Sequence, residues 1–283
     1  MIKYFYSIIS MVKSILLKIK QILRGEQFIL DQYVKVIPSP QCAVDIFKDE
    51  WISKLPEEYG IKTGSAELFT DERINWLIKE IGGVKGKTIL ELGPLEAAHT
   101  YMLHKAGVSE IKAIESNTRA FMKCLIMKEI LNLHNVKMLC GDFRQFLLDT
   151  NEKYDICVAS GVLYHMINPV ELIESISKVA NTVFLWTQYY NKDIINNKPS
   201  IAHKFGRPIV SEHAGFKHTL NRYKYKTALG GMSFCGGTEK YSNWLTKEDL
   251  LLCLKHFNFS NIKINFHELN HINGPAIAII AQK

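Results

Sequence analysis

Three acidic residues, Glu91, Glu115 and Asp142, each stand at or just after the end of a short apolar run. If these runs are parallel strands, their carboxyl ends open on one crevice of the sheet. A carboxylate in that crevice accepts hydrogen bonds from a ribose hydroxyl, an exocyclic amine or an ammonium group. The spacing therefore indicates a nucleotide-type cofactor, with Glu115 on the ribose and with Asp142 and Phe143 on an adenine.

The turn after the first run reads Gly-Pro-Leu-Glu-Ala over residues 93–97. A dinucleotide pyrophosphate needs several glycines for close approach of the backbone, and this turn has only Gly93. Glu96 would also repel phosphate groups. A cofactor without phosphates that carries a sulfonium and an ammonium group suits the acids, which indicates S-adenosylmethionine and disfavours a dinucleotide oxidoreductase. The predicted cofactor-binding residues are Glu91, Gly93, Pro94, Glu96, Glu115, Ser116, Asp142, Phe143 and Ser160.

From residue 88 onwards, apolar runs of strand length alternate with stretches of helical spacing. This alternation predicts βαβ units and an α/β fold with a doubly wound, seven-stranded mixed sheet. The Asn-Gly-Pro loop at 273–275 predicts that the last strand turns back and runs antiparallel. The predicted strands are 88–92, 111–115, 136–140, 154–159, 182–186, 262–266 and 276–281, and the predicted helices are 97–106, 118–133, 143–148, 170–179 and 250–257, with a further helix capped at 70–72.

Residues 86–190 and 245–283 resemble the class I S-adenosylmethionine-dependent methyltransferases. The first motif of that family, E/D-x-G-x-G-x-G, matches residues 88–100, except that Leu95 and Ala97 replace its second and third glycines. Three further segments are similar to the family's ribose, adenine and methyl-side motifs. The resemblance implies a Rossmann-like methyltransferase fold and methyl transfer from S-adenosylmethionine. These three segments are 112–115, 141–143 and 159–165.

The string Gly-Val-Leu-Tyr-His at 161–165 is similar to the tRNA wobble-uridine carboxymethyltransferases. In those enzymes its tyrosine, here Tyr164, contacts a carboxylated cofactor. Two functions follow: methyl transfer to an oxygen or nitrogen, and, as the alternative, carboxymethyl transfer to a tRNA wobble uridine. A non-catalytic adenosyl-binding or membrane-docking module is a third alternative. The predicted catalytic residues are Tyr164, which alternatively only packs on the cofactor, and His165, a general base or else a structural histidine.

The interval 188–243 is much longer than a usual strand–helix connection. It is rich in aromatic and basic residues, which predicts an inserted cap over the crevice for a polar or anionic small molecule or nucleic acid; a solvated surface insertion is the alternative. Its His and Cys residues match no ligand spacing, so no metal is predicted. The predicted substrate-binding residues are Arg73, Tyr189 and Arg222.

The N-terminal residues 1–24 carry five basic residues and no acid, out of a net charge of +7 for the chain. Their apolar residues have helical spacing, which predicts a basic amphipathic helix that contacts a membrane surface peripherally or docks on protein. We place this helix and its connection in residues 1–57 and the methyltransferase domain in 58–283. Six cysteines without a paired pattern favour a reduced, cytoplasmic protein, with the inner face of the membrane as the site of peripheral contact.

Overall fold

The computed structural model describes residues 33–230, 234 and 236–283. By its internal contacts the chain forms two units, Met1–Phe47 and Lys48–Lys283. The sequence analysis placed the boundary after residue 57, whereas in the structure residues 48–57 belong to the second unit.

The described part of the first unit is short. It consists of a helix, α2 (Pro40–Val44), followed by a 3-10 turn, η1 (Asp45–Phe47). The amphipathic helix predicted over residues 1–24, and with it the predicted membrane contact, lies outside the described residues. No helix among the described residues is both long enough and apolar enough to cross a membrane.

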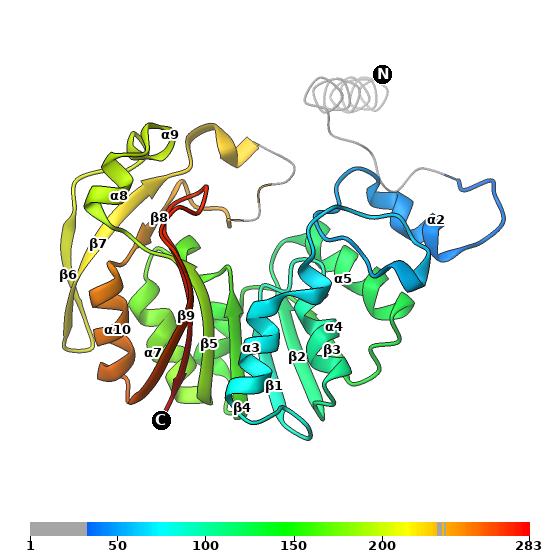
Figure 1. Ribbon diagram of the computed structural model, residues 1–283, viewed down its shortest axis with the longest axis horizontal. Coiled ribbons are helices and arrows are strands. Elements are labelled where there is room, and N and C mark those ends of the chain that lie inside the picture. The colour runs from blue at the N-terminus through cyan, green and yellow to red at the C-terminus, as the bar shows by residue number, and fades with distance from the viewer. Residues whose placement is uncertain (1–32, 231–233, 235) are drawn as a thin grey trace, which may run out of the picture. The chain divides into compact units, whose positions relative to one another are not determined.

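The second unit is built on a seven-stranded sheet with the strand order β3-β2-β1-β4-β5-β10-β9 (Figure 1). The strands from β3 to β5 are parallel, and β10 is antiparallel to both of its neighbours. The predicted mixed sheet with an antiparallel last strand is therefore confirmed. The strands are β1 (Thr88–Leu92), β2 (Glu110–Glu115), β3 (Val136–Cys140), β4 (Tyr154–Ser160), β5 (Ala180–Gln188), β9 (Asn261–Glu268) and β10 (Ala276–Gln282).

Helices cover both faces of this sheet, as a parallel sheet requires (Figure 1). Four of them begin at a side-chain N-cap, provided by Asp71, Asn117, Asp142 and Thr246. The caps at Asn117 and Asp142 directly follow β2 and β3, so the same turns that start the helices also form the crevice. The helices are α3 (Glu72–Glu80), α4 (Ala98–Lys105), α5 (Thr118–Ile130), α6 (Phe143–Asp149), α7 (Pro169–Val179) and α10 (Lys247–His256).

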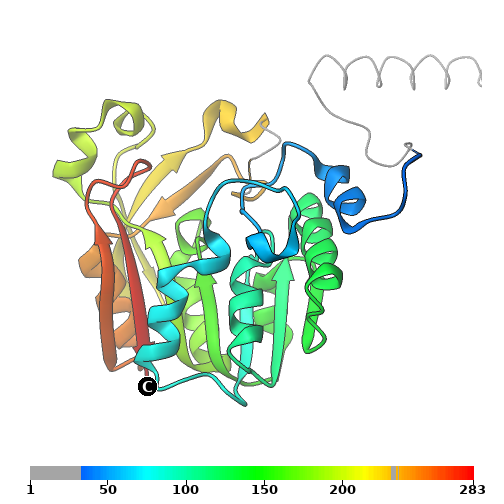
Figure 2. The ribbon, with the colours of Figure 1, turned by 45° about the vertical axis from the view of Figure 1, so that its right-hand side comes forward.

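The insertion between β5 and α10 contains an antiparallel three-stranded sheet that the sequence analysis did not predict (Figure 2). Its strands are mostly half-exposed, so they lack the long apolar run that marks the strands of the main sheet. Aromatic rings join this sheet to the main domain, as Trp244 stacks on Tyr223 and packs edge-on against Tyr164. The elements are α8 (Lys192–Asn196), α9 (Pro199–Ala202), β6 (Ile209–His213), β7 (Phe216–Lys224), η5 (Lys226–Gly230) and β8 (Tyr241–Trp244).

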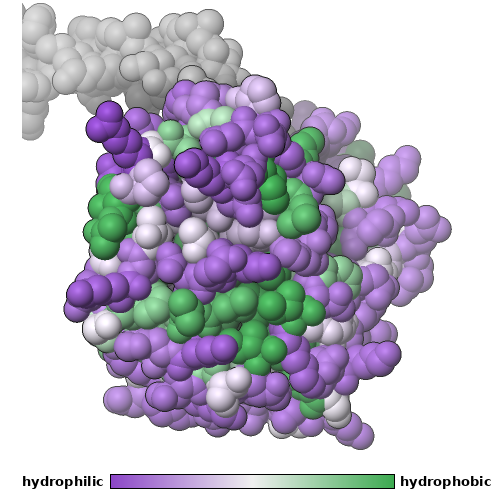
Figure 3. All heavy atoms as spheres, turned by 60° about the vertical axis from the view of Figure 1, so that its left-hand side comes forward, coloured by the Kyte–Doolittle hydropathy of each residue, from purple (hydrophilic) through white to green (hydrophobic). Residues whose placement is uncertain are grey.

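One face of the molecule carries a band of apolar surface between polar regions (Figure 3). The elements on that side of Figure 1 include β6 and α10, which expose Val210 and Leu252 to solvent. The edge strand β9 likewise exposes Ile264.

Candidate active site

A cavity of about 650 Å³ lies at the carboxyl ends of the parallel strands, where ligands of open α/β sheets bind. A pocket of this size is in the usual range for a small molecule or cofactor. Eleven of the residues predicted for the site line it, and segments from the insertion close one side. The predicted residues in the lining are Arg73, Gly93, Pro94, Glu96, Glu115, Ser116, Asp142, Phe143, Ser160, Tyr164 and His165.

Glu115 ends β2 and lines the cavity with a carboxylate that the backbone holds in place. Its Oε2 accepts from the Leu95 N–H at 3.1 Å, and its Oε1 accepts from the Asn117 N–H at 2.8 Å. Burial raises the pKa of this carboxyl, although the backbone N–H groups oppose the shift. A fixed carboxylate that still has acceptor capacity is suited to the two hydroxyls of a ribose.

The cofactor turn (residues 93–97) has the backbone shape of a glycine-rich loop although only one glycine is present. Gly93, Leu95 and Ala97 all have positive φ, at 66°, 57° and 60°. Glycine adopts this region freely, whereas a residue with a Cβ does so at a cost. A Cβ on Gly93 would also lie 3.2 Å from Val162, so this position is sterically restricted. Leu95 and Ala97 therefore adopt the left-handed backbone conformation that glycine favours, which adds strain to the turn.

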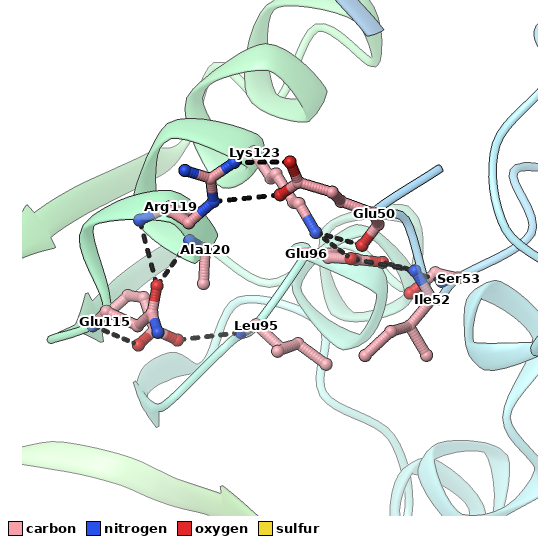
Figure 4. A network of polar contacts seen from close by, with 10 residues as sticks. Glu50, Ile52, Ser53, Leu95, Glu96, Glu115, Arg119, Ala120 and Lys123 are labelled. Atoms are coloured by element: carbon pink, nitrogen blue, oxygen red, sulfur yellow. Dashed lines mark hydrogen bonds and ion pairs between the residues drawn. The ribbon is translucent and has the colours of Figure 1, made fainter. Parts of the chain in front are cut away.

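Glu96 is a lining residue of the cavity, and its carboxylate is directed at the backbone of Ile52 and Ser53 and at Lys123 (Figure 4). The side chain is only 1% exposed and accepts from the N–H groups of Ile52 and Ser53 and from Lys123 Nζ. A buried carboxylate with three donors has little acceptor capacity left for a ligand. Glu96 was predicted to contact the cofactor, whereas in the structure its carboxylate binds a segment more than 40 positions earlier in the chain.

Asp142 both caps α6 and lines the cavity. It accepts from the Arg144 N–H at 2.9 Å and forms a two-pronged ion pair with the Arg144 guanidinium, which lowers the pKa of Asp142. Phe143 follows with its ring in the hydrophobic core and at the cavity wall. Asp142 can therefore cap α6 and face an adenine in the cavity with the same side-chain conformation.

Tyr164 and His165 lie on the 3-10 turn η4 (Leu163–His165), which follows β4. The Nδ1 of His165 is 2.8 Å from the Tyr225 hydroxyl oxygen, and burial lowers the pKa of His165 to about 4. The imidazole is therefore neutral at physiological pH and keeps one ring nitrogen with a lone pair. Tyr164 packs edge-on against Trp186, and both rings line the cavity.

Arg73 reaches the cavity from α3, as predicted, with partners that the sequence analysis did not identify. Its guanidinium lies 4.4 Å from the ring centre of Trp186 and is paired with Asp71, which also binds His99 at 2.8 Å. Burial raises the pKa of Asp71, but His99 and Arg73 outweigh it and hold that pKa well below its usual range. The N-cap signal at Asp71 was visible in the sequence, whereas its contact with His99 depends on tertiary packing.

Three predicted site residues lie outside the cavity lining. Glu91 lies beneath the cofactor turn and is 2% exposed, and its carboxylate accepts from the Thr100 hydroxyl of α4 at 2.6 Å. Tyr189 is buried against β9, where its hydroxyl lies 2.6 Å from His267 Nε2. Arg222 stacks on Tyr241 within the small sheet, 4.0 Å from the ring centre. The cap contributes instead through residues that sequence reasoning did not single out: Phe234, Gly236, Gly237, Thr238 and Glu239.

The buried position of Glu91 leads to a stability prediction. Burial raises the pKa of this carboxyl, so its ionised form is disfavoured in the folded state. A raised folded pKa means that the contribution of Glu91 to stability is present below its unfolded pKa, about 4.5, and is lost as pH rises. The difference in Tm between Glu91→Gln and the wild type should therefore grow in favour of the variant as pH rises from 4 to 7. It should grow by about 2–4 °C for each kcal/mol of stability that the wild type loses.

Thermal unfolding of both proteins at several pH values measures this difference. The exposed Glu129 of α5 offers a matched control, because Glu129→Gln is expected to leave the pH dependence unchanged. A Tm difference for Glu91→Gln that is constant from pH 4 to 7 would show that Glu91 is not responsible for a pH-dependent term.

The described residues contain no group of three His, Cys, Asp or Glu side chains placed to hold a metal ion. Of the cysteines, Cys124, Cys157 and Cys253 are buried free thiols, whereas Cys140 at the end of β3 is exposed.

Fold and site together define an S-adenosylmethionine-dependent methyltransferase: a carboxylate on the second strand, an acid–aromatic pair after the third, and a turn free of phosphate-binding glycines. The profile of the methyltransferase domain family matches residues 84–233, more than half of the chain. The chain therefore belongs to this family. Its cofactor is S-adenosylmethionine, for which the braced carboxylate of Glu115 provides a fitting ribose site.

Two individual proteins of known structure that resemble this chain share less than a fifth of their sequence with it. The crystal structure of the N-terminal domain of EvdMO1, determined in the presence of S-adenosylhomocysteine and D-fucose, is 19% identical, with a TM-score of 0.63 over 86% of this chain and 94% of that one. The N-methyltransferase NodS from Bradyrhizobium japonicum, in complex with S-adenosylhomocysteine, is 13% identical, with a TM-score of 0.50 over 76% of this chain and 87% of that one. At such identities the likeness shows the fold.

A tRNA U34 carboxymethyltransferase from Campylobacter hominis is 24% identical over 120 residues. This match covers 41% of each chain, so it spans less than half the length of that relative.

Proposed function

We propose that the enzyme transfers a methyl group to a hydroxyl oxygen of a polar substrate, with His165 as the general base. The observation that carries this proposal is the position of the His165 imidazole at the cavity wall, just after the strand that ends at Ser160, with its Nδ1 2.8 Å from the Tyr225 hydroxyl oxygen. An alcohol must lose its proton as its oxygen attacks a methyl group, so a neutral base beside it favours that reaction. An unprotonated amine attacks without this requirement.

The bound cofactor supplies a methyl group on a sulfonium. Glu115 holds the ribose, and Asp142 with Phe143 receives the adenine. With the Nδ1–H of His165 donating to the Tyr225 oxygen, Nε2 carries the lone pair that takes the proton of the substrate hydroxyl. With S-adenosylmethionine bound, its methyl C–S bond would break as the C–O bond to the substrate forms, and S-adenosylhomocysteine would leave. Tyr164 and Trp186 supply aromatic walls that orient the acceptor and keep water out.

An acceptor assay with methyl-labelled S-adenosylmethionine tests the proposal. We expect label in polyhydroxylated acceptors, with 6-deoxyhexoses as the first choice because EvdMO1 was crystallised with D-fucose. The product should be an ether that survives alkali. Label found only in amino-group acceptors, or transfer that persists in a His165→Asn variant, would contradict hydroxyl methylation by this base.

Carboxymethyl transfer to a tRNA wobble uridine is the second candidate. The position of Tyr164 at the cavity wall and the similarity to the Campylobacter hominis enzyme favour it. It requires tighter binding of the carboxylated cofactor than of S-adenosylmethionine, and loss of that preference in Tyr164→Phe. Comparing the two affinities in the wild type and in this variant separates the candidates.

A further inference from the structure

The cofactor turn keeps a conformation that its own residues disfavour. Leu95 and Ala97 both lie in the left-handed region, where a residue with a Cβ is strained. Ala97 is fully buried, and its left-handed conformation precedes the first residue of α4. Such strain persists only where surrounding contacts determine the backbone. The structure must therefore contain an element that holds residues 95–97 in place.

The lead-in segment (residues 50–53) is the element that contacts this turn (Figure 4). Glu96, between the two strained residues, accepts from the Ile52 N–H at 3.0 Å and from the Ser53 N–H at 2.7 Å. The same carboxylate is paired with Lys123 Nζ at 2.9 Å, with the two side chains 0% and 9% exposed. A buried carboxylate with these donors is fixed in position, because losing Lys123 would leave its charge uncompensated and losing an N–H group would leave an acceptor unsatisfied.

The lead-in segment is itself held by α5. The carboxylate of Glu50 forms a two-pronged ion pair with Arg119, and the Glu50 carbonyl accepts from Lys123 Nζ. Both basic residues lie on the helix that Asn117 caps. The segment therefore bridges the first turn of the crevice and the helix that starts at the second.

The contacts of the lead-in segment extend through the cofactor turn to Glu115, which we assign to the ribose. Leu95, next to Glu96, donates its N–H to Glu115, and Asn117 donates to the other oxygen of the same carboxylate. A shift of the cofactor turn would therefore remove one of the backbone donors that orient Glu115. This connects a side chain that does not face the ligand to the group that binds it.

We propose that Glu96 is a positioning residue for the cofactor. By binding the lead-in segment and Lys123, it holds Leu95 and Ala97 in the conformation that glycines adopt without strain, and so replaces the two glycines absent from this turn. The inference rests on S-adenosylmethionine as the cofactor and does not depend on which substrate is methylated.

A double-mutant cycle read out by calorimetric titration with S-adenosylhomocysteine tests this inference. Glu96→Gln is made in the wild type and in a background that carries Leu95→Gly and Ala97→Gly. We expect a loss of affinity of about 10-fold or more in the wild type, and of less than about 3-fold in the glycine background, where the strain is absent. The cycle cancels any contact that the Leu95 side chain itself makes with the ligand.

Two further variants complete the design. Glu67→Gln changes an exposed carboxylate that pairs with Lys54, and should bind like the wild type. Glu50→Gln weakens the Arg119 pair without burying a new polar group, so it provides a folded variant with a smaller loss of the same kind if Glu96→Gln does not fold.

The outcomes separate this inference from the cofactor assignment. Wild-type protein that fails to bind S-adenosylhomocysteine would overturn the assignment itself. If the wild type binds and Glu96→Gln binds equally well, Glu96 is not a positioning residue. Equal losses in both backgrounds, for Glu96→Gln or for Glu50→Gln, would also overturn the inference, because the anchor would then act independently of the strained turn.

Discussion

The His165→Asn variant is expected to lower the turnover number about 10²–10⁴-fold, the usual contribution of a general base. Asparagine keeps a polar side chain next to the Tyr225 hydroxyl but cannot take a proton. Affinity for S-adenosylhomocysteine should stay close to that of the wild type, because the ribose and adenine groups of the site are untouched. Turnover of a hydroxyl acceptor and calorimetric affinity, measured on the same preparations, check both halves of this prediction.

The pH profile adds a second readout. Because the pKa of His165 is lowered to about 4, the base is unprotonated throughout the neutral range. Turnover should therefore fall only as pH drops towards 4. His213, a partly exposed histidine that contacts Glu174, is the matched control, and His213→Asn should turn over normally. A fall in turnover between pH 6 and 7 that disappears in His165→Asn would show that the imidazole titrates normally and is not the base described.

The Glu115→Ala variant should weaken binding of S-adenosylhomocysteine by about 1–3 kcal/mol, which corresponds to roughly 5- to 150-fold. The lost carboxylate is the acceptor that we propose for the ribose hydroxyls, and it also accepts from the Leu95 and Asn117 N–H groups. The effect should appear in affinity for both S-adenosylmethionine and its product, since both carry the same ribose.

Glu110, at the exposed start of the same strand, provides the comparison for Glu115. Glu110→Ala is expected to bind S-adenosylhomocysteine as the wild type does. Equal affinities for Glu115→Ala and the wild type would exclude Glu115 from the ribose site and would require a different orientation of the adenosyl group in the crevice.

The main sheet follows from the sequence because most of its strands are short apolar runs between turn residues, and the central ones are almost completely buried. Thr88–Leu92 and Val136–Cys140 match β1 and β3 at both ends, since each apolar run stops at a turn residue. The acids at these strand ends could be predicted as neighbours for the same reason: parallel strands bring their carboxyl ends to one edge.

Other parts of the site depend on contacts between residues that are distant in sequence. The sequence predicts Glu96 as an acid that faces the pocket. Its actual partners are Lys123 and the lead-in segment more than 40 residues earlier, and sequence spacing does not reveal them. Tyr189 and Arg222 have the chemistry of substrate contacts, but His267 and Tyr241 hold them elsewhere. The small sheet of the insertion escapes periodicity analysis because its strands are neither continuously apolar nor strictly alternating.

Calorimetric titration of the wild-type protein with S-adenosylhomocysteine, with NAD as the comparison ligand, tests the central claim most directly. The account predicts a saturable isotherm with one site for S-adenosylhomocysteine and no heat of binding for NAD, because the cofactor turn has no second glycine where a pyrophosphate would lie. The absence of binding heat with S-adenosylhomocysteine, or a clear isotherm with NAD, would contradict it.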